Sequence, residues 1–471
     1  MLDFIKKISY KQVLFFLVTT LVFQFVLLKD LPFFWDGISK SVRASWIYNS
    51  NFTEWIVPTN INSGHPPLWI LLLATFWTVF QKALWSSRLL LLLVNIGAVW
   101  QLVLLCKTNF IKGIFPFLIF LVCLEPTFIA QTTSLNNDML LLFFTLLAIN
   151  SLIKNKLFFF TFAVTGLLFT NLRGMYIVLA ILLIHFAYLK YKLIEVKKSM
   201  YLGYLLSVLL FSIFCALQYQ KLGWFIISLN EGYNDHRQSV DFKQIIINTI
   251  VVLKCFLEYG RFIVYIILLP LIIKYLKERK NNKNKEIDRL LLAFLIFVFV
   301  LLAGMIPFSN PIGDRYFMIC YMLSIVLLIN LVNRYLANKK TIIYSLIAVF
   351  FISGHFWVYP ATISQSWDSS LAYINYYKVE SKMEHFITSH GIDKSQIGTR
   401  IRLNERFYSE LKTVEDAKRY STFDIDTNEY ILLSNIENYT KDEELNHVRN
   451  NWKLIKKYSQ LGVFVSLYKK P

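Results

Sequence analysis

Residues 13–37, VLFFLVTTLVFQFVLLKDLPFFWDG, combine a long apolar run with an aromatic cluster and a carboxylate. The run carries no charged residue between positions 13 and 28, and its length is close to that of a bilayer span. Asp36 follows shortly after the run ends. Because a carboxylate is costly near lipid, an Asp at such a boundary indicates a functional site.

The composition of the whole chain extends this pattern. The 471 residues are 56% hydrophobic and 17% charged, and the mean hydropathy is +0.49, whereas soluble proteins are about 25% charged. The chain is therefore predicted to be an all-α polytopic membrane protein with about 11–13 transmembrane helices. Its candidate spans are 13–29, 67–81, 86–106, 112–124, 137–153, 157–171, 173–190, 201–219, 260–276, 289–307, 315–333 and 341–359, and 244–258 is either a span or an interfacial helix.

The net positive charge lies in residues 1–360, the part of the chain that contains the candidate spans. Residues 1–360 hold 33 Lys and Arg against 15 Asp and Glu, whereas residues 361–471 hold 16 against 15. Short basic loops mark the cytoplasmic side of a membrane, whereas nucleic-acid binding calls for a basic patch on a soluble domain. No nucleic-acid partner is predicted.

The basic loops also predict the orientation of the chain. Lys6, Lys7 and Lys11 place the N-terminus in the cytoplasm, with the loops near 154–156, 190–198, 274–289 and 334–340 on the same side. Residues 30–66, Asp138 and everything after about 360 then lie outside. This alternation requires an even number of crossings between residue 66 and Asp138, where three apolar segments occur. We therefore expect 67–81 or 112–124 to be re-entrant or interfacial.

The last quarter of the chain has a different character. Residues 361–471 are charged throughout, with short apolar strands near 430–434 and 462–468 and helical patterns at 371–390 and 442–458. A small extracytoplasmic α/β domain is predicted there, following a transmembrane domain over 1–360. The cysteines all lie in or beside apolar runs, so neither a disulfide framework nor a cysteine metal site is indicated; they are Cys106, Cys123, Cys215, Cys255 and Cys320.

Two carboxylates lie in the first outer loop. Asp36 could act as a general base on an acceptor hydroxyl, or it could cap a short helix that continues through Trp46. Glu54 is either a second site residue or an ordinary solvated side chain.

Two further motifs open later helices from the outer side. In Gly64-His65-Pro66-Pro67-Leu68 the prolines favour a helix start, and His65 could bind a metal, contact phosphate or lie in the interface. In Leu135-Asn136-Asn137-Asp138 the carboxylate could serve chemistry, although the helix dipole alone would favour it there.

Outer-face arginines oppose the usual charge bias and therefore need an anionic partner. Arg173 lies between two tight spans, and Arg315 begins another. Phosphate suits the planar guanidinium, although Arg315 could instead pair with the adjacent Asp314. His236 and Arg237 are further site candidates in the long outer loop.

Taken together, these motifs resemble the GT-C glycosyltransferases, in the branch of the protein O-mannosyltransferases and aminoarabinose transferases. The resemblance covers about residues 10–335, and it departs from many relatives in having Gly37 where they carry Glu and His65 where they carry an acidic residue or Lys. The residues that carry it are Asp36, Pro66-Pro67, Arg88, Asp138 and Arg315-Tyr316.

The resemblance implies an inverting transfer of a hexosyl or pentosyl group from a polyprenyl-phosphate carrier to an acceptor outside a bacterial inner (plasma) membrane. Asp36 would be the base, and Asp138 would orient the acceptor or the sugar. Arg173 and Arg315 would hold the leaving phosphate. A divalent cation is a possible cofactor, with His65 and Asp138 as possible ligands. The other implied substrate-binding residues are His65, Tyr316, Glu54 and Arg88.

Two other functions are open from the sequence. A transporter or flippase of lipid-linked glycans would place charges deep within its spans and break helices near the midplane, whereas the charges here are at span ends. An envelope scaffold that only displays its C-terminal domain would not need clustered outer Arg and Asp residues.

Overall fold

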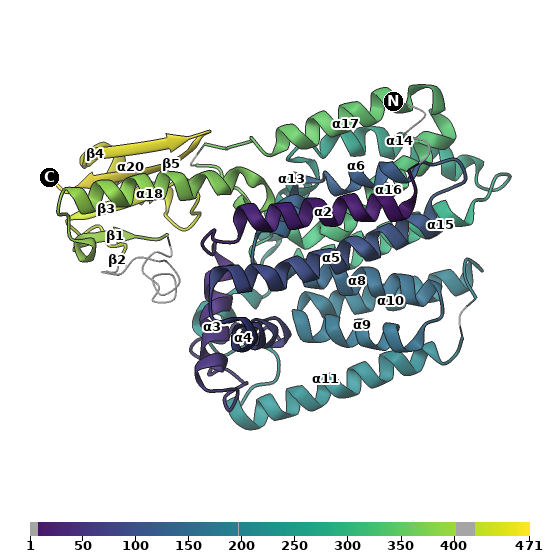
Figure 1. Cartoon of the computed structure of the whole chain (residues 1–471), viewed down its shortest axis with the longest axis horizontal. Coiled ribbons are helices and arrows are strands. Elements are labelled where there is room, and N and C mark those ends of the chain that lie inside the picture. Colours follow the sequence, from purple (N-terminus) through teal and green to yellow (C-terminus); the bar gives the residue numbers. More distant parts are fainter. Residues whose placement is uncertain (1–7, 196, 361, 402–419) are drawn as a thin grey trace.

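The computed structural model describes residues 8–195, 197–360, 362–401 and 420–471, so Lys6 and Lys7 lie outside the described residues. Within these ranges, long helices pack side by side, and a small sheet with its own helices projects from one end of the bundle (Figure 1). Most of the apolar core lies between the helices, and it continues into the C-terminal part.

Six helices are long and apolar enough to cross a membrane, and two bent helix pairs raise the number to eight if each is one span. The six are α2 (Tyr10–Leu28), α5 (Leu84–Asn109), α10 (Arg173–Lys190), α11 (Met200–Leu222), α15 (Lys285–Met305) and the continuous η3 (Asp314–Phe317) and α16 (Met318–Tyr335). The bent pairs are η1 (Pro116–Leu118) and α6 (Ile119–Cys123) with α7 (Pro126–Thr133), and α13 (Phe242–Leu257) with α14 (Phe262–Glu278).

Shorter elements complete the bundle. Three are apolar helices below the length of a full span: α4 (Leu68–Phe80), α8 (Asp138–Ile153) and α9 (Leu157–Thr170). The others are α3 (Asp36–Asn49), α12 (Glu231–Asn234), η2 (Asp235–Arg237), η4 (Ala337–Lys339) and α17 (Lys340–Gly354). Every apolar segment expected from the sequence therefore falls on a helix.

The structure explains how the three apolar segments between residue 66 and Asp138 can make an even number of crossings. Figure 1 shows α4 nearly end-on while α5, α8 and α9 run across the view, so α4 lies crosswise to the bundle. The helices on either side of Glu125 are bent by 73°, and those on either side of Glu258 by 95°. By length and composition six to eight helices qualify as spans. If α4 does not cross, each bent pair crosses once and the shorter α8, α9 and α17 also cross, the number of crossings is eleven, the lower bound of the prediction.

Burial separates the lipid-facing helices from the central one. α16 is buried along nearly its whole length, as expected for a helix that is apolar on all sides and packed on all sides. α11 instead leaves large apolar side chains exposed, Leu205 at 65% and Leu209 at 54% among them. Such a surface suits lipid rather than water. The chain is an integral membrane protein.

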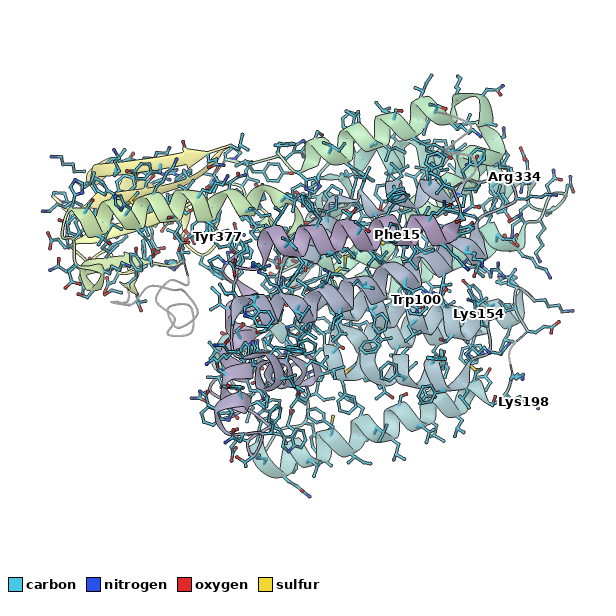
Figure 2. All side chains as sticks on the ribbon, viewed as in Figure 1. Phe15, Trp100, Lys154, Lys198, Arg334 and Tyr377 are labelled. Carbon is cyan, nitrogen blue, oxygen red and sulfur yellow. The ribbon has the colours of Figure 1, made fainter. Side chains whose placement is uncertain are left out.

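The basic loops gather at one end of the bundle. Lys154, Lys198 and Arg334 lie at the end opposite the sheet (Figure 2). This separation agrees with the charge pattern from which the cytoplasmic side was predicted. The orientation of the termini remains a prediction.

The C-terminal part is a five-stranded mixed sheet in the order β2-β1-β3-β5-β4. β1 (Ile397–Thr399) pairs in parallel with β2 (Ser421–Thr422) and β3 (Tyr430–Ser434), and β5 (Val463–Lys469) is antiparallel to β3 and β4 (Lys453–Gln460). α18 (Ile374–Ser389), which follows η5 (Trp367–Ser369) and η6 (Leu371–Tyr373), packs on β4 and β5. η7 (Lys394–Gln396) precedes β1, and α20 (Asp442–Asn451) buries Leu445 and Val448 against Ile431 of β3.

One helix expected in this part is too long. The pattern at 442–458 predicts a single helix, but α20 ends at Asn451 and β4 begins at Lys453. Leu461 and Gly462 both have positive φ, at 46° and 85°, which is typical of a tight two-residue hairpin turn. Pairing with β5 through this turn outweighs the helical preference of the Lys-rich segment.

Candidate active site

Asp36 is held at the start of α3, at the end of the bundle nearer the sheet (Figure 1). The N-cap position belongs to Trp35, which makes no side-chain cap, so the helix-capping alternative for Asp36 is wrong. The Asp36 carboxylate instead forms an ion pair with Arg315 and lies 3.8 Å from Lys40 Nζ. Its side chain is 41% exposed, so it remains accessible to a ligand.

Arg315 lies where three carboxylates from distant segments meet. Its guanidinium bonds to Asp36 and Asp368, and its Nε is 3.6 Å from Asp138 Oδ2. The alternative pairing with Asp314 is not formed, because the Asp314 carboxylate bonds to Arg261 instead. Arg315 thus connects the N-terminal loop, α8 and the C-terminal part.

Arg173 and Asp138 start neighbouring helices and pair directly. Arg173 Nη2 donates to Asp138 Oδ1 at 2.6 Å, and the guanidinium stacks on the Tyr316 ring at 3.9 Å from its centroid. A Cβ at Gly174 would lie 1.9 Å from the Leu167 carbonyl oxygen. Only glycine permits this close return of the chain, so Gly174 holds Arg173 at its position.

Lys40 is a site residue that the sequence analysis missed. Its Nζ donates to Asn136 Oδ1 at 3.1 Å, beside Asp36. Burial lowers the pKa of Lys40 to about 8, although the Asp36 carboxylate acts in the opposite direction. Its spacing four residues after Asp36 was the available signal, because such residues share one helix face.

Asp368 was also missed, because it lies in the part of the chain predicted as a separate domain. It accepts from Asn136 Nδ2 at 3.1 Å and pairs with Arg315. Burial raises the pKa of its carboxyl group, with Arg315 opposing that shift. η5 is anchored on the bundle by the hydrogen bond from Gln131 Nε2 to the Asp368 carbonyl, at 2.8 Å. No short-range sequence pattern predicts a contact over such a separation.

His65 is buried in cationic surroundings. Its Nδ1 has no hydrogen-bond partner within the described part of the chain. Burial, followed by Arg237 and Arg43, lowers the pKa of His65 well below its usual range, so the ring is neutral. Arg237 is fixed by donation to the Ser63 carbonyl at 2.7 Å. This concentration of positive charge does not suit a metal cation at His65, and Asp138 already pairs with arginine.

These side chains surround a cavity of about 360 Å³. Its wall contains five residues expected from the sequence resemblance, which are Asp36, His65, Arg173, Arg315 and Tyr316. It also contains His236 and Arg237 from the outer loop, with the unexpected Lys40, Tyr176 and Tyr233. Asp138 lies behind the arginines rather than on the wall.

Two expected site residues lie elsewhere. Glu54 pairs with Lys221 at 2.6 Å, with both side chains partly exposed. Arg88 is buried and donates to the backbone carbonyls of Leu31, Pro32 and Thr133. Arg88 therefore joins the first outer loop to the end of α7, and the structure does not bring it to the cavity.

Comparison with known proteins finds matches among solved structures. No protein-family model matches the chain, and no curated protein matches its sequence. Among solved structures, ArnT from Cupriavidus metallidurans bound to undecaprenyl phosphate is similar, with a TM-score of 0.51 and 10% identity over 96% of this chain and 97% of that one. The chain has the fold of ArnT. ArnT in the apo state agrees, with a TM-score of 0.53 and 10% identity over 97% and 98%.

The ArnT-like fold covers the C-terminal sheet as well as the helices, since the match spans nearly all of both chains. The resemblance drawn from short motifs is thus confirmed as a fold. At 10% identity it assigns no reaction to this chain, so the site must be judged by its own geometry.

The cavity of this ArnT-like fold has a small excess of positive charge. Its wall presents four cations, which are Lys40, Arg173, Arg237 and Arg315. Three carboxylates pair with these cations: Asp36, Asp138 and Asp368. Arg43 is a further buried cation beside the neutral His65, so cations outnumber carboxylates around the cavity. Such a site favours an anion.

Proposed function

We propose that this protein transfers a sugar from a polyprenyl-phosphate carrier to an acceptor on the outer side of a bacterial inner membrane, with inversion at the anomeric carbon. The observation that carries the proposal is the cavity at the outer helix ends, in which Arg173 and Arg315 face a single accessible carboxylate, Asp36. A carrier phosphodiester is negatively charged, which suits the excess of positive charge around the cavity. The undecaprenyl phosphate bound to ArnT is a carrier of this class.

The arginines would bind the phosphate and stabilise it as it leaves. Charge develops on the leaving phosphate as the bond to the sugar breaks, and preorganised cations favour that transition state. Arg173 is already oriented by Asp138 and Tyr316, and its buried Nη1 has no hydrogen-bond partner among the described residues. That donor is therefore available to a phosphate oxygen.

Asp36 would act as the general base. A carboxylate paired with Arg315 and near Lys40 stays ionised, which lowers its basicity while the cavity is empty of anion. When a phosphate engages Arg315, the carboxylate is released to accept the proton of an acceptor hydroxyl. Attack by that hydroxyl from the face opposite the phosphate gives inversion.

The position of the charges favours transfer over transport. Asp138 begins α8, Arg173 begins α10 and Arg315 lies just before α16, so all three are at helix ends. A transporter site would be expected near the midplane, at broken helices that carry the substrate. The charged residues at the two helix breaks here, Glu125, Glu258 and Arg261, belong to buried ion pairs and do not line the cavity.

The donor can be identified by mass spectrometry of lipids that co-purify in mild detergent with the wild-type chain and with Asp36→Asn. We expect a polyprenyl-phosphate sugar enriched in Asp36→Asn, because the donor binds but is not consumed. Lipid-linked oligosaccharides bound equally to both chains would contradict the proposal and favour transport. Release of polyprenyl phosphate from added donor by the wild type alone provides a second test.

The topology has its own test. A reporter fused after Pro471 is expected to be active only outside the cytoplasm, because an odd number of crossings separates it from the N-terminus. A cytoplasmic signal would remove Asp368 and the C-terminal domain from the outer site.

A further inference from the structure

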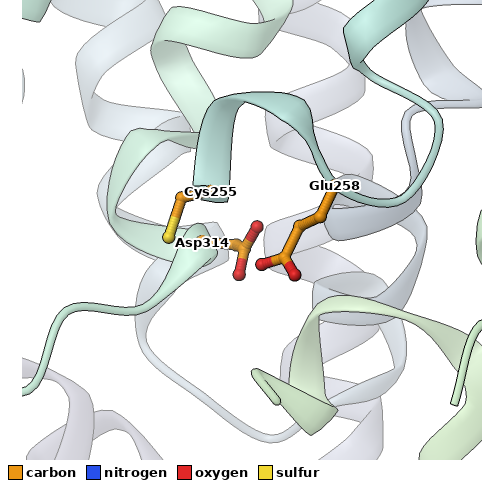
Figure 3. Close-up of side chains that lie close together, drawn as sticks. All are labelled: Cys255, Glu258 and Asp314. Carbon is orange, nitrogen blue, oxygen red and sulfur yellow. The ribbon is translucent and has the colours of Figure 1, made fainter. Parts of the chain in front are cut away.

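A second cluster of potential ligands lies near the cavity but is not part of it. Cys255 at the end of α13, Glu258 at the α13–α14 break and Asp314 of η3 are all buried, and their candidate ligand atoms lie within 4.8 Å of one another. Figure 3 shows the three side chains converging from these elements. None of them lines the cavity.

One ligand atom in this cluster is buried without a partner. Asp314 Oδ1 is bound by Arg261, whereas Asp314 Oδ2 has no hydrogen-bond partner among the described residues, and the side chain is 0% exposed. Glu258 Oε2 accepts from the Tyr359 hydroxyl at 2.9 Å and lies 3.6 Å from Lys254 Nζ. The carboxyl groups of Glu258 and Asp314 face each other, so a fully buried acceptor without a donor here calls for either a bound cation or a shared proton.

The charge balance points in the same direction. The local ion pairs contain three carboxylates, which are Glu125, Glu258 and Asp314. Among the described residues, the cations paired with them are Arg261 and Lys254. With all three carboxyl groups ionised, one negative charge would be left over in a buried site, which is costly, so the site must take up either a cation or a proton shared by Glu258 and Asp314. A divalent cation bound with Cys255 as its thiolate would leave no net charge.

We propose that Cys255, Glu258 and Asp314 form a binding site for a divalent transition metal of the zinc class. One sulfur and two carboxylate oxygens suit Zn²⁺ better than Mg²⁺, which prefers oxygen ligands alone. Zinc bond lengths would separate the ligand atoms by roughly 3.3–3.7 Å, which requires only a small closing movement from their present separations of 4.8 Å or less.

The metal would have a positioning role. Asp314 precedes Arg315 in η3, and Glu258 marks the break between α13 and α14. An ion held by both would join the bent pair to the helix that carries the phosphate-binding arginine. The site is independent of the proposed sugar transfer, because metal binding can be measured without donor or acceptor.

The test uses the full chain in detergent, stripped with a chelator, equilibrated with Zn²⁺ and freed of unbound metal. We expect about one zinc per chain by elemental mass spectrometry, with zinc affinity lowered about a hundredfold or more in Cys255→Ser and in Glu258→Gln. Cys123→Ser, which changes another buried cysteine, is the matched control and should retain zinc. Equal zinc in Cys255→Ser and wild type, or none in wild type, would overturn the proposal.

A second measurement needs no variant. Co²⁺ bound through a thiolate gives a sulfur-to-metal charge-transfer band in the near ultraviolet, which we expect in the wild-type chain. Zn²⁺ should remove this band by displacement and should raise the thermal midpoint by mass action. A wild-type chain without the band or the shift would show instead that Glu258 and Asp314 share a proton.

Discussion

Asp314 and Arg315 are neighbours in the chain, but their side chains enter two different ion-pair networks. The Arg261 network comprises Arg261, Glu125, Asp314, Glu258 and Lys254, and the side chains of its first three members are 0–1% exposed. The Arg315 network comprises Arg315, Asp36, Asp138, Asp368, Arg173 and Lys40, and it opens on the cavity through Asp36, which is 41% exposed.

The two networks differ in how accessible they are to a ligand, not in the residue types that form them. Both join arginine to several carboxylates at helix ends. In the Arg261 network the pairs made by Arg261 itself are closed off, so their charges can only stabilise the fold or hold an ion. In the Arg315 network a ligand can replace one carboxylate at the arginine. The same residue types therefore serve structure in one place and binding in the other.

The largest expected effect comes from replacing Asp36, the proposed base in the Arg315 network. Asp36→Asn should lower sugar transfer about a thousandfold or more, because the amide cannot accept the acceptor proton. Transfer from purified donor is the measurement, and the thermal midpoint should stay close to wild type. Asp424→Asn, in an exposed loop of the C-terminal domain, is the control. Full activity of Asp36→Asn would refute the assignment of the base.

The next prediction compares the two arginines. Arg261→Met should destabilise the protein by about 3–5 kcal/mol, because it leaves buried carboxylates without a cation. Arg315→Met should cost less stability, since Asp36 is 41% exposed and Asp138 keeps its pair with Arg173, but it should abolish donor binding. Thermal unfolding in detergent and donor binding are measured for both. Equal loss of stability would mean that the two networks do not differ as described.

Asp368 tests whether the C-terminal domain competes for the phosphate. Asp368→Asn should lower the KM for donor by about tenfold, because one carboxylate no longer opposes the anion at Arg315. Steady-state kinetics over a donor titration measures this effect, again with Asp424→Asn as control. A KM that rises would show that Asp368 chiefly orients Arg315.

The smallest expected effect is on pH dependence. Lys40 is charged below its pKa of about 8 and neutral above it, so the cavity loses a positive charge as pH rises through that value. Donor affinity should fall a few-fold between about pH 7 and about pH 9. In Lys40→Arg this decrease should disappear, because arginine stays charged. A decrease that persists in Lys40→Arg belongs to another group.

Much of the site could be predicted because its residues carry local signals. Asp36, His65, Arg173 and Arg315 each stand beside an apolar run, where a polar or charged residue is conspicuous in the sequence. Lys40 carried only the weaker signal of its spacing from Asp36. Glu54 and Arg88 show the limit of this reasoning. Glu54 pairs with Lys221 and Arg88 donates to backbone carbonyls, and the sequence alone does not distinguish either residue from one that lines the site.

The sequence by itself determined the membrane class, the helical segments and the end of the bundle where charge collects. These properties follow from apolar length and charge bias, which each segment carries alone. Only the tertiary structure decided that Asp368 pairs with Arg315, that Asp314 pairs with Arg261 and that the segment after α20 is a strand rather than a helix. Each of these depends on which distant group packs nearby, since partners in buried ion pairs and sheets are chosen by proximity in the fold.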